Sequence, residues 1–138
     1  MMEFFMPMDP PTATAQEKQV MVRDGKPVFY SPDQVKAAKQ KLLAHLAKHK
    51  PEKPYTCGLR LEVLWCFAPH NKNQLPGTYR TIRPDTDNLQ KMLKDCMTEC
   101  GFWKDDALVA SELVEKFWSD VPGIWIRIRQ LQENSNAD

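Results

Sequence analysis

Apolar residues recur along the chain with two different spacings, and each spacing predicts a different kind of element. From residue 59 to residue 67 they occupy every second position, at Leu59, Leu61, Val63, Trp65 and Phe67. Because successive side chains of a strand point to opposite faces, this alternation predicts a strand with one core face. Residues 124–131 alternate in the same way. Other β-prone runs predict strands at 3–8 and 108–118.

Two other segments have the spacing of three or four residues that an amphipathic helix requires. Ser31-Pro32, a capping residue followed by proline, opens the first helix, which we expect to run to about Lys48. The second helix starts near residues 85–87 and ends at Gly101, a residue suited to the left-handed conformation after a helix. Its expected inward face is made of Leu89, Met92, Leu93 and Cys96.

The length of the chain predicts one domain over residues 1–138. With 138 residues, 42% of them hydrophobic, the chain can bury one core but not two. Residues 12–30 are expected to form a loop and a small hairpin, because Asp24-Gly25 is a common turn dipeptide. Residues 132–138 are expected to be a disordered tail.

The sequence indicates no export and no membrane span. No apolar run approaches the roughly 20 residues of a membrane helix, and the start of the chain lacks the pattern of a signal peptide. We therefore expect a cytoplasmic protein with no membrane partner. In that compartment the four cysteines are expected to be thiols, at Cys57, Cys66, Cys96 and Cys100.

The formal net charge of +1 is an average over a chain in which basic and acidic residues lie in separate segments. Six lysines and a single acid, Glu52, lie between Lys36 and Lys53, and the first two of these lysines are Lys36 and Lys39. A second basic tract contains Lys72, Arg80 and Arg83 without an acid. The acids gather instead at Asp85, Asp87, Asp105 and Asp106. The pattern indicates a basic surface around a small acidic centre.

Asp85, Asp87 and Asp106 are candidate magnesium ligands, because this hard cation prefers carboxylate oxygens from separate parts of a chain. Asp87 has a competing interpretation as a helix N-cap, with Gln90 completing a capping box. Lys91, four residues after Asp87, fits either an exposed ion pair or an ammonium beside a scissile phosphate. The residues alone leave both alternatives open.

Three further patterns have structural explanations that we favour. His45 and His49 have the spacing of a metal pair but no third ligand, so a solvated helix face is expected. Cys96 and Cys100 share that spacing and are expected to be small buried hydrophobes. Trp125, Arg127 and Arg129 lie on one face of the last strand, which suits a sheet surface better than a DNA platform.

Two blocks of the sequence resemble the signature of the RusA family of Holliday junction resolvases. The first is Arg83-Pro84-Asp85-Thr86-Asp87-Asn88-Leu89-Gln90-Lys91, and the second, after a helix-length gap, is Gly101-Phe102-Trp103-Lys104-Asp105-Asp106. The resemblance implies an active site of Asp85, Asp87, Asp106 and Lys91. The three aspartates would be the metal ligands, with Asp105 as an accessory residue.

The same resemblance implies an α+β fold, a single domain in which a small mixed sheet packs with two main helices. It further implies a homodimer with two active sites, and a phage or prophage origin for many relatives. The expected activity is Mg²⁺-dependent hydrolysis, with Mn²⁺ as a substitute, that makes paired nicks in four-way DNA junctions during recombination and repair. No small-molecule substrate is expected. DNA phosphates are expected to contact Lys36, Lys39, Lys72, Arg80 and Arg83.

Two other functions compete with this expectation. A protein of phage replication or recombination could bind branched DNA without cutting it, although the complete acidic set argues against that. A divalent-ion binder without enzymatic activity leaves the basic tracts unexplained.

The path from the second helix back to Asp106 is a geometric test of the proposed site. A helix from Asp87 to Cys100 is about 20 Å long, whereas the five residue-to-residue steps from Gly101 to Asp106 reach at most about 17 Å. Asp106 can approach Asp87 only if this segment runs nearly extended alongside the helix. A site completed across a dimer is the alternative.

Overall fold

The computed structural model describes residues 1–14, 21–23, 26–28 and 32–132. They form a four-stranded sheet in the order β1-β6-β4-β5. The central strands are β4, Leu59–Phe67, and β6, Gly123–Gln130, and the outer strands are β1, Met2–Pro7, and β5, Val109–Trp118. Strand β4 pairs parallel with β5 and antiparallel with β6, which pairs antiparallel with β1. The sheet is therefore mixed, as expected.

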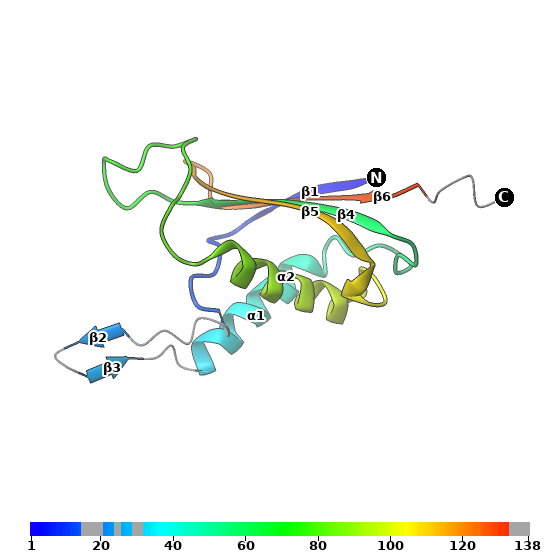
Figure 1. Cartoon of the computed structure of the whole chain (residues 1–138), viewed down its shortest axis with the longest axis horizontal. Coiled ribbons are helices and arrows are strands. Elements are labelled where there is room, and N and C mark those ends of the chain that lie inside the picture. The colour runs from blue at the N-terminus through cyan, green and yellow to red at the C-terminus, as the bar shows by residue number, and fades with distance from the viewer. Residues whose placement is uncertain (15–20, 24–25, 29–31, 133–138) are drawn as a thin grey trace.

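Two helices lie on the same side of this sheet (Figure 1). Helix α1 is Pro32–Leu46 and helix α2 is Thr86–Cys100. Parallel strands need a crossover connection, and here α2 makes it between β4 and β5. A short 3-10 helix, η1, Asp106–Leu108, precedes β5, so this strand starts at Val109 rather than at residue 108. The α+β fold with two main helices is confirmed.

The core lies between the helices and the sheet. The alternating residues of β4 from Leu59 to Phe67 are all buried, as are Ile124, Ile126 and Ile128 of β6. The predicted inward face of α2 is also buried, together with Met97. Residue Gly101 follows the helix with a φ of 98°, the left-handed conformation that the sequence predicted.

The smaller predictions have mixed outcomes. Strands β2, Met21–Arg23, and β3, Lys26–Val28, pair antiparallel as the predicted hairpin, while Asp24-Gly25, Ser31 and residues 133–138 lie outside the described residues. All four cysteines are free thiols, and burial raises the pKa of Cys96 to about 11.

His49 is half-buried and stacks on Phe4, so its predicted solvated position is wrong. None of the described helices has the length and apolarity needed to cross a membrane.

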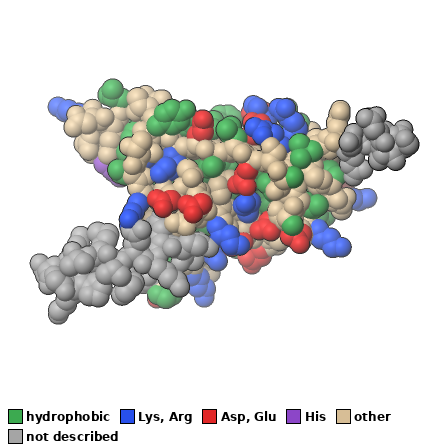
Figure 2. All heavy atoms as spheres, in the orientation of Figure 1, with side chains coloured by type: hydrophobic (Ala, Val, Ile, Leu, Met, Phe, Trp, Pro, Cys, Tyr) green, Lys and Arg blue, Asp and Glu red, His purple; other side chains and the backbone are tan. Residues whose placement is uncertain are grey.

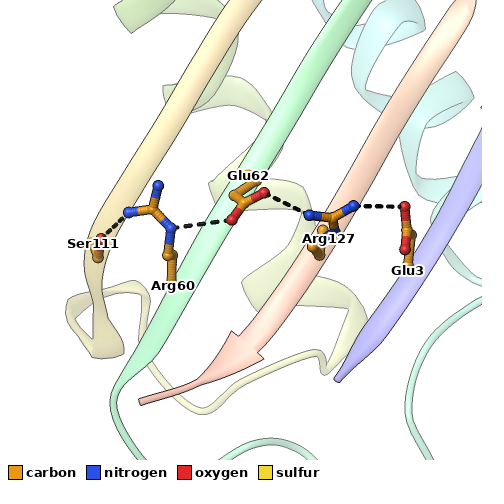
Figure 3. A network of polar contacts seen from close by, with 5 residues as sticks. All are labelled: Glu3, Arg60, Glu62, Ser111 and Arg127. Atoms are coloured by element: carbon orange, nitrogen blue, oxygen red, sulfur yellow. Dashed lines mark hydrogen bonds and ion pairs between the residues drawn. The ribbon is translucent and has the colours of Figure 1, made fainter.

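The side of the sheet that faces away from the helices carries a row of ionic contacts (Figure 3). Arg127 donates to Glu62 at 3.2 Å and to Glu3 at 3.1 Å. Arg60 donates to Glu62 at 3.1 Å and also contacts Ser111. Carboxylates neutralise the charge of Arg127, which leaves less positive charge on this face to attract DNA. The contacts therefore favour a sheet surface over a DNA platform.

Candidate active site at the start of helix α2

Both aspartates of the first block lie at the start of α2, but the N-cap residue is Asp85 and not Asp87. Asp85 is extended, with φ −71° and ψ 150°, and its carbonyl oxygen accepts the first helical bond from Leu89 N–H at 3.1 Å. Its carboxylate makes no capping hydrogen bond. Asp87 is exposed in the first turn, where the positive end of the helix dipole favours an anion. The capping interpretation of Asp87 is therefore wrong.

Gln90 does not complete a capping box. Its side chain forms hydrogen bonds with one residue of β4 and one residue of β5. Its side chain is only 3% exposed. The amide oxygen accepts a hydrogen bond from the indole Nε1 of Trp65 at 2.8 Å, and the amide nitrogen donates to Glu112 at 2.8 Å. Lys94 donates to the other oxygen of the Glu112 carboxylate at 2.9 Å. These contacts join α2 to β4 and β5, which fixes the helix that carries Asp87 and Lys91.

An open hollow of about 370 Å³ lies between this part of α2 and β5. Its lining residues on α2 are Thr86, Asp87, Gln90, Lys91 and Lys94, and those on β5 are Glu112 and Val114. The hollow thus contains an exposed carboxylate and an exposed ammonium one helical turn apart. Glu112 was not among the predicted site residues, because a charged residue in an alternating strand is ordinary and no local pattern marks it.

Lys91 is in an ion pair, but its partner is Asp95 rather than Asp87. The two side chains approach to 2.9 Å, and the lysine side chain is 51% exposed. The hydrogen bond from Lys91 to Asp95 and the charge of Asp95 raise the pKa of the lysine, and the charge of Asp106 raises it further. The ammonium form of Lys91 is therefore favoured mainly by Asp95 of the same helix, with a smaller contribution from Asp106 of the second block.

The second block returns alongside α2, which brings Asp106 into electrostatic range of Lys91. Phe102 and Trp103 are buried, and the Trp103 indole donates to Thr98 of α2 at 2.7 Å. Asp106 then begins η1, which contacts α2. The neighbouring Asp105 carboxylate accepts from Ala107 N–H at 2.9 Å and so caps η1. The second block thus returns to α2 within one chain and reaches the neighbourhood of Lys91, but among the described residues Asp106 does not join Asp85 and Asp87 in one group of ligands. Asp105 has a structural role there as the cap of η1.

The predicted metal ligands suit magnesium in chemistry but do not form a closed set. Among the described residues, no three His, Cys, Asp or Glu side chains lie close enough together to hold an ion. A closed set is not required, because Mg²⁺ is usually held by one or two carboxylates with waters and substrate phosphates. Carboxylates at the start of α2 are such ligands, so the donors present fit this ion.

Arg80, one of the predicted DNA contacts, precedes α2 and is buried rather than exposed. Arg80 is only 6% exposed, and its guanidinium lies 4.0 Å from the ring centre of Phe67 and 4.8 Å from that of Trp118. It also donates to the carbonyl oxygen of Arg83. This position does not suit a phosphate contact, and the prediction failed to anticipate it because sequence does not show which side of a loop faces the core.

The other predicted DNA contacts are accessible. Lys36, Lys72 and Arg83 are exposed and Lys39 is half-buried. Figure 2 shows acidic and basic side chains close together on the face in view rather than in separate patches. The separation of charges along the sequence is therefore partly lost on the folded surface.

Comparison with known proteins shows the family to which the chain belongs. The family model described as endodeoxyribonuclease RusA matches residues 9–129. The chain is 28% identical over 136 residues to a protein of Lactococcus phage r1t named crossover junction endodeoxyribonuclease rusA, covering 97% of this chain and 91% of that one. It is 29% identical over 121 residues to the uncharacterised protein YqaN of Bacillus subtilis strain 168, covering 80% and 84% respectively. The family match spans most of the chain and includes both motif blocks, and the chain therefore belongs to the RusA family of endodeoxyribonucleases.

Proposed function

We propose that this protein is a Holliday junction resolvase, which makes paired nicks in four-way DNA junctions with the help of Mg²⁺. The name of the phage relative supports the substrate, since that protein aligns with nearly the whole chain. The observation that carries the proposal is the arrangement around Lys91. This lysine shares an open hollow with Asp87 and lies within the electrostatic influence of Asp106 from the second block.

In this proposal one or two of Asp85, Asp87 and Asp106 would hold the magnesium ion together with water and a phosphate oxygen, and Mn²⁺ could substitute for it. A bound ion of this kind lowers the pKa of its water and stabilises charge on a phosphate oxygen. Lys91 would neutralise charge that develops on the phosphate in the transition state. Asp95 would keep that ammonium protonated and oriented, because it binds Lys91 at 2.9 Å in the free protein. An exposed hollow suits a phosphodiester backbone, which has to approach from solvent.

We further propose a homodimer that acts with the DNA in the cytoplasm. A two-fold dimer would present two identical sites, and this suits a junction in which two strands are nicked. Light scattering on the pure protein should then give about twice the mass of the 16.0 kDa chain. A mass of one chain at working concentrations would contradict the dimer without affecting the chemistry of a single site.

The decisive experiment is incubation of the pure protein with a labelled synthetic four-way junction, with and without Mg²⁺. We expect symmetric nicks with Mg²⁺, binding without cleavage in EDTA, and little cutting of a linear duplex of the same sequence. Binding without cleavage under all conditions would favour the accessory DNA-binding function. Metal binding without junction binding would leave only the ion-binding function.

The exposed basic residues lead to a prediction about salt. If Lys36, Lys72 and Arg83 contact phosphates, log K for the junction should fall linearly with log salt concentration. Changing all three to glutamine should make the slope shallower by roughly two to three units, since each phosphate contact contributes about 0.9. Arg80→Gln is the matched control, because the buried Arg80 should affect melting temperature and not the slope. An unchanged slope in the triple variant would mean that DNA follows another path.

A further inference from the structure

Two basic side chains bind the main chain immediately before Asp85. The ammonium of Lys116 donates to the carbonyl oxygen of Ile82 at 2.8 Å and to that of Pro84 at 2.7 Å. The guanidinium of Arg80 donates to the carbonyl oxygen of Arg83. Three successive carbonyl groups, the last directly before Asp85, are therefore bound by cations.

The two cations are themselves fixed to the edge of the sheet. Lys116 belongs to β5, the edge strand, and its carbonyl oxygen accepts from Arg80 N–H at 2.9 Å. The loop also pairs with β5 at Trp118, which accepts from Gly77 N–H at 2.7 Å and donates to Thr78 at 2.9 Å. The aromatic rings of Phe67 and Trp118 hold the Arg80 guanidinium from the core side. The main chain that leads to Asp85 is thus tied to a rigid strand.

Tight control of this segment matters for ligand geometry rather than for the fold alone. Asp85 is the last extended residue before α2, so the preceding backbone decides where its carboxylate points. A functional site needs its ligands placed within about 0.5 Å. A neutral donor could satisfy the same carbonyl groups, and burying a guanidinium is costly unless it is well paired. Here two cations bind three successive carbonyl groups and attach this segment to β5.

We propose that Lys116, with Arg80 as its buried support, is a positioning residue that places Asp85 and thereby sets the affinity of the site for its divalent ion. This inference rests on the proposed function. It goes beyond the aspartates and Lys91, because Lys116 acts through main-chain carbonyl groups and does not touch the ion.

The test is Lys116→Met in the full chain, with metal affinity as the main measurement. Loss of partners that orient metal ligands typically weakens metal binding 10–100-fold. We expect calorimetry without DNA to show Mn²⁺ binding at least ~10-fold weaker, and the Mg²⁺ concentration for half-maximal single-turnover cleavage to rise by a similar factor. The rate at saturating Mg²⁺ and the junction affinity in EDTA should stay within a few-fold of wild type.

The sign of the change separates positioning from simple charge. If Lys116 acted on the ion only through its positive charge, its removal would relieve repulsion and strengthen Mn²⁺ binding. Positioning predicts weaker binding. Lys116→Arg keeps the charge and can still donate to two oxygens, so it should restore Mn²⁺ affinity to within about three-fold, since only small adjustments of geometry are needed.

Arg127→Met is the control for stability, because it removes two ion pairs from the opposite side of the sheet. It should keep wild-type Mn²⁺ affinity even if its melting temperature falls. If Lys116→Met does not fold, Lys116→Ala, which also removes the donor, is measured in the same way. Wild-type metal affinity in the folded Lys116 variant would overturn the inference. A wild-type protein that neither binds Mn²⁺ nor cuts junctions would instead refute the proposed function.

Discussion

Asp87→Asn is expected to abolish junction cleavage while leaving the fold and junction binding intact. Asp87 is exposed in the hollow beside Lys91 and is not the N-cap of α2, so its carboxylate is available to a metal. Asparagine has the same shape but brings no anionic oxygen. The single-turnover rate in Mg²⁺ should fall by at least roughly 10³-fold, which corresponds to about 4 kcal/mol of transition-state stabilisation.

Asp33→Asn is a matched control for this substitution. Asp33 is the second residue of α1 and Asp87 is the second residue of α2, and both helices have 15 residues. Each substitution removes a favourable interaction with the helix dipole that is worth about 0.3–1 kcal/mol. The two variants should therefore show similar, small decreases in melting temperature in EDTA, and only Asp87→Asn should lose cleavage. Wild-type cleavage by Asp87→Asn would refute the assignment of the site.

Local sequence was enough to predict the elements that carry the site. The alternation from Leu59 to Phe67 predicted both the bounds and the buried face of β4, because burial of one face dictates a period of two. Gly101 predicted the end of α2, because the chain there adopts a positive φ. These signals depend only on neighbouring residues, and they predicted that the two aspartate blocks lie at the two ends of α2.

Other features of the site depend on contacts between distant residues, and sequence did not indicate them. The order of the sheet places β4 between β5 and β6, and no local pattern encodes that choice. Consequently, the role of Glu112 as partner of Gln90 and Lys94 was not predicted. The burial of Arg80 was missed for the same reason, because its aromatic partners come from β4 and β5.

The helix start shows a subtler failure. Asp is common at N-caps, and Gln90 three residues after Asp87 resembled a capping box. Asp87 was the residue that sequence offered as a cap, whereas the extended conformation of Asp85 moves the boundary two residues earlier. The difference matters for the proposed site, because Asp87 then lies inside the first turn, where it lines the hollow.

Lys91→Ala should have the second largest effect, a fall in the single-turnover rate of roughly 10²-fold at saturating protein. Junction affinity should stay within a few-fold of wild type, because the proposed phosphate contacts of Lys36, Lys72 and Arg83 would remain. The folded protein should be nearly as stable, since an exposed ion pair contributes little. An equal loss of rate and affinity would make Lys91 a DNA-binding residue rather than a catalytic one.

The pH dependence of cleavage tests how Lys91 is held. Its pKa is raised, first by the hydrogen bond to Asp95 and the charge of that residue, so the ammonium persists to higher pH than usual. If catalysis needs the ammonium, the rate should decline as the pH rises through this raised pKa. Asp95→Asn removes the main cause, so the decline should begin at a lower pH while the rate near pH 7 changes little. An alkaline decline at the wild-type position in Asp95→Asn would show that another group, and not Lys91, controls it.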